Sequence, residues 1–567
     1  MSSYFHAVAV DYDGTLVRGP RPTPEVLDAV ATARDKGFKV VLVTGRILAE
    51  LRGDFPDVDQ HFDCIVGENG AVLSTRQGTR LLASPVDASL ELALRTQAIP
   101  VRRGEVLLAT FAIHDEIVER MIDRLGLECQ IIRNRGALMV LPASINKGSG
   151  LIEALADLGI SPHNTIGIGD AENDHSLLDA CEIGVAVGDA VASLKARADV
   201  VLPGADSSAV GAFLAGPLLG GLAGTRSKRR TITLGTYDDG TAVTVPASRA
   251  TIAIHGPSGT GKSYLAGLIA EQLIQMDYTI CILDLEGDHL AIGGLHGAVS
   301  VGGREPLPPP AQVDRLIRQG FTSVVIDLSL KDPDVKRRYA LSMVEQLRQT
   351  RAAVGMPHWI IIDEAHVPIA AGSERCWRKS DESGVCFITY RPDLLAPELD
   401  QSADFVIAPR ADHLATIREP GEGPGRVFAA TQRVTAHVRH WHKYIEGQLP
   451  ADRRFYFRDR HGLTGRSAGN LLEFRDEISR ASGDTLRHHA AHGDFSRWLS
   501  SVCPTPSIVN TTQLVELALA GATMVSDVEG LRDQLLRALD GKPSLPAGET
   551  GAQPVQAPPA LAAQRQR

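Results

Sequence analysis

The chain has 567 residues, too many for a single hydrophobic core, so about three or four domains are expected. Its net charge of −10 excludes a general electrostatic attraction to nucleic acid. Its seven cysteines form no Cys-x-x-Cys pair, which argues against a disulfide framework or a zinc ribbon and indicates a reducing compartment.

Residues 1–222 alternate short apolar runs with amphipathic helical stretches. Continuous apolar strands separated by helices are typical of a parallel sheet covered on both faces. We therefore predict an α/β fold with a doubly wound parallel sheet. The expected strands cover residues 5–10, 39–44, 64–70, 165–170, 183–188 and 199–203.

Residues 80–144 interrupt this alternation and predict a small α+β insert. Because the insert lies between segments with candidate catalytic residues, we expect it to form a cap over the site. The expected elements are two helices (86–99 and 114–125) and three strands (105–112, 129–135 and 137–142).

The rest of the chain predicts a second α/β domain and a helical module. A linker over 223–230 leads to the second domain over 231–445, which opens with a hairpin turning at Asp239-Gly240. A mostly helical accessory module follows over 446–545. The Pro-, Ala- and Gln-rich tail over 546–567 is expected to be disordered.

Neither a membrane span nor a signal peptide is expected. The uncharged stretch Ala209–Thr225 contains Pro217 and several glycines, which divide it into pieces too short to cross a bilayer. No basic segment precedes Phe5, where strand-like sequence begins. We therefore expect a cytoplasmic protein.

The first candidate site is an acidic pair, Asp11 and Asp13, at the end of the first apolar run. Asp11 is the candidate nucleophile toward phosphorus, and Asp13 the candidate acid and base. Functional groups in open α/β sheets gather at the carboxyl ends of strands, so Thr44 and Lys147 should lie nearby and hold phosphoryl oxygens.

The same edge predicts a Mg²⁺ site. Asp170 and Asp11 offer the hard oxygen ligands that Mg²⁺ prefers, and Asp13 and Asp174 complete the expected set. The cation would let an anionic nucleophile approach an anionic phosphate. Alone, the Asp-x-Asp-Gly-Thr run could instead be a turn with a capping aspartate.

The segments DYDGT, VTGR, NKGSGL and GDAEND, in this order, resemble the four motifs of the haloacid dehalogenase (HAD) superfamily of phosphatases. GENGAV and GVAVGDA resemble its Cof-type branch, and the likeness covers about residues 1–216. The cap resembles those of phosphoglycolate, sucrose-phosphate and mannosyl-phosphoglycerate phosphatases. Asp189 departs mildly, because many members have Asn there. The resemblance implies a Mg²⁺-dependent phosphatase acting through an aspartyl phosphate on a small phosphorylated metabolite.

The second candidate site is a complete Gly-x-x-x-x-Gly-Lys-Ser loop between an apolar strand and a helix. Its glycines let backbone N–H groups surround phosphates, while the lysine reaches the β and γ oxygens and the serine ligates Mg²⁺. The run WIIIDEAH adds a carboxylate to support Mg²⁺ and one to polarise water. The predicted ATP-site residues are Gly256, Gly259, Thr260, Gly261, Lys262, Ser263, Asp363 and Glu364.

GTYDDGTAVTV, CILDLEGDH and CFITYRPDLL resemble the HerA/FtsK class of ATPases over about residues 231–440. The resemblance implies ATP hydrolysis, ring-shaped homo-oligomers and translocation of nucleic acid. Tyr390 stands where the class usually has a glutamine that senses the γ-phosphate. Arg391 is retained, and the resemblance implies that it also belongs to the nucleotide site. The change calls rapid, coupled hydrolysis into question but leaves nucleotide binding in place.

Two further clusters have alternative interpretations. Lys336, Arg337, Arg338, Arg348 and Arg351 form either a basic stripe for nucleic acid or an ordinary solvated helix face, which we favour. In the last module, His488, His489, His492 and Asp494 suggest either a metal site or, as we favour, a polar helix end.

Three functions therefore compete. The favoured one is a two-enzyme chain, a phosphatase for a sugar phosphate or phosphoglycolate-like acid joined to an ATP-binding and slowly hydrolysing domain. The second is an ATP-driven nucleic-acid translocase with an accessory phosphatase. The third is a nucleotide-sensing scaffold in which ATP orders an oligomer.

Overall fold

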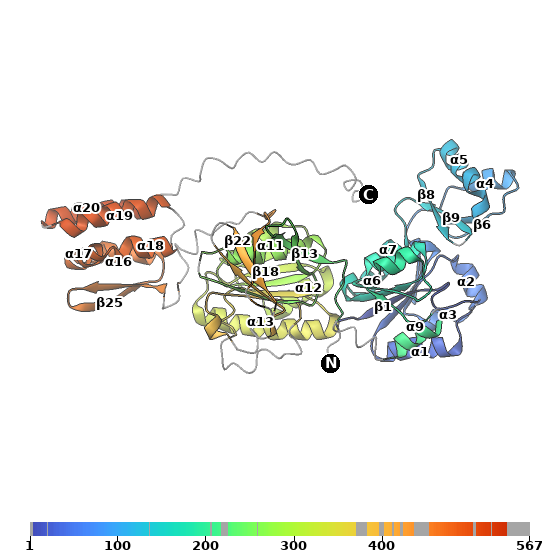
Figure 1. The fold of residues 1–567 in the computed structure, drawn as a ribbon, viewed down its shortest axis with the longest axis horizontal. Coiled ribbons are helices and arrows are strands. Elements are labelled where there is room, and N and C mark those ends of the chain that lie inside the picture. Colours follow the sequence, from blue (N-terminus) through green and yellow to red (C-terminus); the bar gives the residue numbers. More distant parts are fainter. Residues whose placement is uncertain are drawn as a thin grey trace. The chain divides into compact units, whose positions relative to one another are not determined.

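The chain forms two compact units, Met1–Val438 and Arg439–Arg567. The first unit contains two sheet-based domains, and the second is a smaller, mostly helical module (Figure 1). The computed structural model describes residues 4–540, apart from 20, 135, 205–206, 217–224, 258, 370–382, 396–401, 411–412, 420–422, 424, 436–448, 450–452, 503–505 and 523. The predicted tail over 546–567 and half of Ala209–Thr225 lie outside these residues.

The first domain is built on an eight-stranded sheet of order β12-β11-β10-β1-β2-β3-β4-β5. β1 is central and pairs in parallel with β10 and β2, so its carboxyl end lies where the strand order reverses. The strands are β1 (Ala7–Asp11), β2 (Lys39–Val43), β3 (Cys64–Gly67), β4 (Val72–Thr75), β5 (Gly78–Leu81), β10 (Thr165–Gly169), β11 (Ile183–Ala186) and β12 (Val200–Val201).

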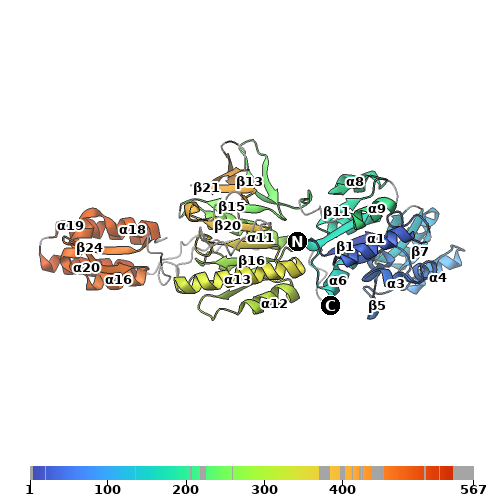
Figure 2. The ribbon, with the colours of Figure 1, turned by 90° about the horizontal axis from the view of Figure 1, so that it is seen from below.

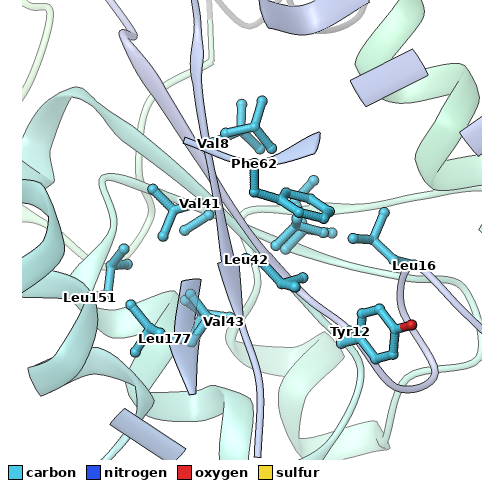
Figure 3. Close-up of a cluster of buried hydrophobic side chains, with 14 of the residues drawn as sticks. Val8, Tyr12, Leu16, Val41, Leu42, Val43, Phe62, Leu151 and Leu177 are labelled. Carbon is cyan, nitrogen blue, oxygen red and sulfur yellow. The ribbon is translucent and has the colours of Figure 1, made fainter. Parts of the chain in front are cut away.

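Helices cover both faces of this sheet, as the doubly wound prediction requires (Figure 1). Val41 and Val43 of β2 lie with Leu151 and Leu177, whereas Leu42 points to the opposite side (Figure 3). This alternation of buried side chains explains the continuous apolar run in the sequence. The helices are α1 (Pro24–Asp35), α2 (Leu48–Asp54), α3 (Val58–His61), α6 (Lys147–Leu158), α7 (His175–Ala180), α8 (Ala192–Arg197) and α9 (Ser207–Ala215).

The cap is a four-stranded antiparallel sheet of order β6-β7-β9-β8 with two helices. A buried carboxylate joins it to the sheet below, because Glu68 accepts hydrogen bonds from the backbone N–H groups of residues 105, 106 and 107 at 2.9–3.1 Å. The elements are α4 (Ala88–Thr96), β6 (Arg102–Arg103), β7 (Leu108–Phe111), α5 (Asp115–Leu125), β8 (Cys129–Asn134) and β9 (Ala137–Pro142).

The second domain is an 11-stranded sheet of order β14-β13-β23-β22-β21-β15-β20-β19-β16-β18-β17. The strands from β21 to β17 pair in parallel, and the remainder form an antiparallel extension that begins with the predicted hairpin. The strands are β13 (Thr231–Thr236), β14 (Ala242–Pro246), β15 (Thr251–His255), β16 (Ile280–Asp284), β17 (Ala298–Gly302), β18 (Ser323–Asp327), β19 (Trp359–Ile362), β20 (Val385–Thr389), β21 (Phe405–Pro409), β22 (Leu414–Arg418) and β23 (Arg426–Ala430).

Two hydrophobic cores lie on the two faces of the second sheet. α11 (Lys262–Gln275) contributes to one core, and α12 (Pro310–Gly320) and α13 (Pro333–Val354) contribute to the other (Figure 2). This arrangement confirms the predicted P-loop-type α/β fold.

The module of the second unit packs five helices against a two-stranded hairpin, and its core contains Phe457, Phe474 and Phe495. The mostly helical prediction is thereby confirmed. Its elements are β24 (Phe455–Asp459), β25 (Gly462–Ala468), α16 (Leu471–Arg480), α17 (Gly483–His492), α18 (Asp494–Val502), α19 (Pro506–Gly521) and α20 (Val525–Asp540). Among the described residues, every helix is too short or too polar to cross a bilayer.

Candidate active sites

The centre of the first site is Asp11, the last residue of β1. Its side chain is buried, at 3% exposure, and its Oδ1 lies 2.6 Å from the Nζ of Lys147. The same ammonium lies 2.6 Å from Oδ1 of Asp174. Two carboxylates that are 163 positions apart in sequence therefore share one buried cation.

Local capping places Lys147 at this point. Asn146 and Ser149 form a reciprocal capping box that starts α6 at Lys147, with the lysine side chain toward the carboxyl edge of the sheet. Burial alone would lower the pKa of Lys147, but Asp11 and Asp174 raise it above its usual value, so the ammonium is charged at neutral pH.

The acidic cluster fits a divalent cation. Ligand oxygens of Asp11, Asp170 and Asp174 all lie within 4.8 Å of one another, and all three residues are buried. Thr15 donates a hydrogen bond to Oδ1 of Asp170 at 3.2 Å. Burial and the Asp174 carboxylate raise the pKa of Asp11 well above its usual range. Carboxylates held this close need more positive charge than Lys147 supplies, as Mg²⁺ would provide.

Asp13 lies apart from this cluster. Arg46 donates to both of its carboxylate oxygens, at 2.6–3.1 Å, and also to Asp54 at 2.9 Å. The Asp13 side chain is 46% exposed, consistent with the predicted proton-transfer role, and its carboxylate is outside the three-residue metal group. Thr44 is fully buried, and its hydroxyl accepts a hydrogen bond from the backbone N–H of Arg46.

A cavity of about 320 Å³ opens over Asp11 between the sheet and the cap. The cap contributes residues from β6 to β9, and the core contributes α2 and the catalytic loops. The cap residues of this lining could not be predicted, because side-chain direction in short strands depends on their register. The lining is Asp11, Asp13, Gly45, Arg46, Ile47, Glu50, Asp54, Arg102, Ala109, Asn134, Ala137, Met139, Lys147 and Asn173.

The second site lies at the start of α11. Gly259 and Gly261 have φ values of +86° and +103°, a conformation that favours glycine. The helix begins at Lys262, whose buried ammonium donates to the Pro257 carbonyl at 3.0 Å. Thr260 donates to the same carbonyl at 2.9 Å. The loop therefore has the backbone needed to surround phosphates at a helix N-terminus.

Several acidic groups face this loop. Burial raises the pKa of Asp363 well above its usual range, and the charge of the Glu364 carboxylate, the second largest cause, acts in the same direction. Asp284, His289 and Asp363 have ligand atoms within 4.8 Å of one another and are buried. The hydroxyl of Ser263 donates to Asp288 at 2.9 Å.

Sequence reasoning missed Asp288, Asp284 and His289 as site residues. All three belong to the segment CILDLEGDH, whose family likeness was the available signal. Lys336, on α13, was also missed as a site residue. Burial lowers its pKa, and its side chain interacts with the charges of the acidic residues at this site.

Tyr390, at the position of the usual γ-phosphate sensor, and the retained Arg391 both contact neighbouring side chains. Arg391 forms two hydrogen bonds with Asp393, at 2.9 and 3.0 Å. The Tyr390 ring packs edge-on against His366 at 5.0 Å, and Nδ1 of His366 lies 3.4 Å from Glu364. Tyr390 is thus linked to the predicted water-polarising carboxylate through His366.

A buried polar network joins the two domains of the first unit. His163 stacks on Tyr278, with ring centroids 3.6 Å apart, and both contact Glu182, at 2.9 and 2.8 Å. These residues precede β10, β16 and β11. The contact is made by the amino ends of strands, whereas both candidate sites lie at carboxyl ends.

His358 extends this network. Its Nδ1 accepts a hydrogen bond from the backbone N–H of Thr279 at 2.9 Å, and its Nε2 lies 3.2 Å from Oδ1 of Asn164. Burial, with the nearby charges of His163 and Arg351, lowers the pKa of His358 well below its usual value. The imidazole is therefore neutral in the folded protein at neutral pH.

This neutrality predicts acid sensitivity. Below about pH 6.5 an unfolded histidine binds a proton that folded His358 does not, so the free energy of unfolding should fall by about 1.4 kcal/mol per pH unit from this group. Denaturant unfolding of wild type and His358→Gln at several pH values checks this. The difference in the free energy of unfolding between wild type and His358→Gln should shrink as the pH falls. A difference that does not change with pH would contradict the neutral, buried state of His358. Exposed His296, replaced by Gln, is the control.

In both ambiguous clusters some side chains are held inside the protein, so neither cluster is simply a solvated surface, and the favoured interpretations stay predictions. His489 lies 2.8 Å from Asp494 and accepts a hydrogen bond from the backbone N–H of Arg458, so both ring nitrogens are engaged. In α13, Lys336 is largely buried, and the guanidinium of Arg351 donates to four backbone carbonyls. These two basic side chains are therefore unavailable to a surface stripe.

Two family models match the chain. The model of haloacid dehalogenase-like hydrolases matches residues 8–93 and 106–214, and that of the helicase HerA central domain matches residues 235–344. Both resemblances expected from the motifs are thereby confirmed.

Individual proteins match the first domain. The chain is 29% identical over 213 residues to the phosphoglycolate phosphatase of Methanothermobacter thermautotrophicus, covering 36% of this chain and 95% of that protein. It is 28% identical over 211 residues to that of Methanoculleus marisnigri, covering 34% and 88%. A solved haloacid dehalogenase-like hydrolase from Bacteroides thetaiotaomicron matches with 18% identity and a TM-score of 0.33, covering 37% and 98%.

Proposed function

Because the chain combines a haloacid dehalogenase-like hydrolase domain with a HerA-type central domain, we propose that it is a Mg²⁺-dependent phosphatase joined to an ATP-binding domain. The observation that carries the proposal is the Lys147 ammonium, held between Asp11 and Asp174 beside Asp170. This set combines a buried nucleophile, a fixed cation and a cation-binding group at one end of a cavity.

The residues account for both halves of phosphoester hydrolysis. The Asp11 carboxylate attacks phosphorus as the bond to the leaving oxygen breaks, and Asp13 gives that oxygen a proton. Water then attacks the aspartyl phosphate, Asp13 takes the proton from water, and Asp11 is released with inorganic phosphate. Lys147 and Thr44 hold the phosphoryl oxygens. A bound Mg²⁺ would reduce the repulsion between the Asp11 carboxylate and the phosphate.

The proposed substrate is a small phosphorylated metabolite, either a sugar phosphate or a phosphoglycolate-like acid. A cavity of about 320 Å³ is at the small end of ligand sites. The names of the matched archaeal relatives favour the acid. A panel of phosphometabolites, assayed by phosphate release with and without ATP, tests this assignment, and failure to hydrolyse any of them would reject it.

Metal removal should stop this reaction. Asp11, Asp170 and Asp174 repel one another and the substrate when no divalent cation is present. We therefore expect chelator-treated protein to lose phosphatase activity and to regain it with Mg²⁺. Full activity after chelation, with metal content checked by elemental analysis, would reject Mg²⁺ dependence.

The second domain is proposed to bind ATP at Lys262 and Ser263 and to hydrolyse it slowly with Glu364. The buried contact of Glu182 with Tyr278 gives a route by which nucleotide state could reach the phosphatase domain. ATP should therefore change the kcat or KM of the phosphatase, and Tyr278→Phe should weaken that effect.

We place both reactions in the cytoplasm, where the five described cysteines would remain thiols.

A second candidate is an ATP-driven nucleic-acid translocase, which the HerA central-domain match favours. The use of Arg351 and Lys336 within the protein argues against a basic track on α13. DNA-stimulated ATP hydrolysis at low salt distinguishes the two proposals. Stimulation, together with nucleotide-dependent oligomers in size measurements, would favour translocation.

A further inference from the structure

An ion pair crosses the cavity between the cap and the core. Arg102, on β6 of the cap, lies 2.7 Å from the carboxylate of Glu50 on α2. Both residues line the same cavity as Asp11 and Lys147. Among the ion pairs of the described residues, this one alone joins the cap to the core.

The three cations of the cavity differ in how firmly they are held. Lys147 is buried between two carboxylates. Arg46 contacts both Asp13 and Asp54. Arg102 is 55% exposed and has the single carboxylate of Glu50, itself 40% exposed, as its ion-pair partner.

Exposed pairs of this kind contribute little stability, so their partners exchange readily. A guanidinium also matches the planar geometry of a carboxylate with two parallel hydrogen bonds. Arg102 is therefore the cation most open to a group on a ligand.

We propose that Arg102 binds a carboxylate on the leaving group of the substrate, which takes the place of Glu50. The inference rests on the proposed phosphatase function and narrows its substrate to a short phosphorylated hydroxy acid, in preference to a neutral sugar phosphate. Arg102 keeps one carboxylate partner in this exchange, and the displaced Glu50 side chain, already 40% exposed, turns to solvent.

The alternative role for this pair is a simple clamp that holds the cap shut. The two roles predict different effects for the two partners. In a clamp, loss of Arg102 or of Glu50 weakens the same contact and impairs catalysis on every substrate. In substrate recognition, loss of Arg102 removes the binding group, whereas loss of Glu50 removes its competitor.

The test compares two substrates of matched size, 2-phosphoglycolate and 2-hydroxyethyl phosphate, which replaces the carboxylate with a hydroxymethyl group. Arg102→Gln should lower kcat/KM for 2-phosphoglycolate by about 30- to 100-fold, mainly through KM. It should leave 2-hydroxyethyl phosphate within about threefold of wild type. Glu50→Gln should lower the KM for 2-phosphoglycolate severalfold.

Arg95→Gln is the matched control, because Arg95 is also on the cap, is also 55% exposed and is paired with a glutamate away from the cavity. It should leave both substrates unchanged. Equal losses on both substrates in Arg102→Gln and Glu50→Gln, with wild-type thermal melting, would overturn the recognition role but leave the phosphatase in place. Wild-type protein that releases phosphate from neither these substrates nor the wider panel would overturn both.

Discussion

Asp11→Asn should abolish phosphate release from every phosphoester that the wild-type protein hydrolyses. Asp11 lies 2.6 Å from Lys147; the amide removes the negative charge and the nucleophilicity of this side chain, and it cannot form an acyl phosphate. We expect kcat to fall by at least about 10⁴-fold, a loss typical of removing a catalytic nucleophile. Steady-state phosphate release, with Mg²⁺ saturating, measures this effect.

The matched control is Asp63→Asn, an aspartate of the same domain that pairs with Arg34 and Lys39 away from the cavity. This variant should keep wild-type turnover. Replacing one of three clustered carboxylates also lowers their mutual repulsion and so changes the stability of the domain. Thermal melting of Asp11→Asn therefore checks that the domain still folds. Folded Asp11→Asn protein with more than a tenth of wild-type turnover would refute the nucleophile assignment.

Lys262→Ala should remove ATP hydrolysis while sparing the phosphatase chemistry. Its ammonium is buried at the first residue of α11, where it can reach the β and γ oxygens of a bound nucleotide. Loss of this charge should lower the ATP turnover rate by about 10²- to 10³-fold. The measurement is phosphate release from ATP by two proteins that both carry Asp11→Asn, one with Lys262 and one with Lys262→Ala. The shared substitution silences the first site, so any difference comes from Lys262.

Glu364→Gln separates binding from hydrolysis at the same site. It keeps the charge of Lys262 and changes only the group predicted to polarise water. Nucleotide binding should therefore persist in Glu364→Gln and be weak in Lys262→Ala. Equal ATP turnover in wild type and Lys262→Ala would show that the P-loop is not the hydrolytic site.

The first site could be largely predicted because one rule of topology governs it. Asp11 ends a buried parallel strand, Thr44 and Asp170 each directly follow one, and the carboxyl ends of such strands meet. Lys147 follows the cap, and its capping box fixes where its helix begins. The roles of these residues stay predictions, but their proximity depends only on strand order.

Other features were beyond the sequence. β4 and β5 extend the first sheet in antiparallel fashion, and their short runs lack the continuous apolar pattern of the buried strands. Arg46 pairs with Asp13 because of side-chain direction, which periodicity does not encode. The network of His163, Tyr278 and Glu182 depends on how two domains dock, and single buried polar residues carry no such signal.

The central claim is that Asp11 carries the phosphoryl group between the two steps. The most direct test is mass spectrometry of acid-quenched protein during turnover, with the modified residue located by peptide sequencing. We expect the mass of one phosphoryl group on Asp11 in wild type and its absence in Asp11→Asn. Rapid turnover with no adduct at Asp11, or with the adduct on another residue, would contradict the mechanism.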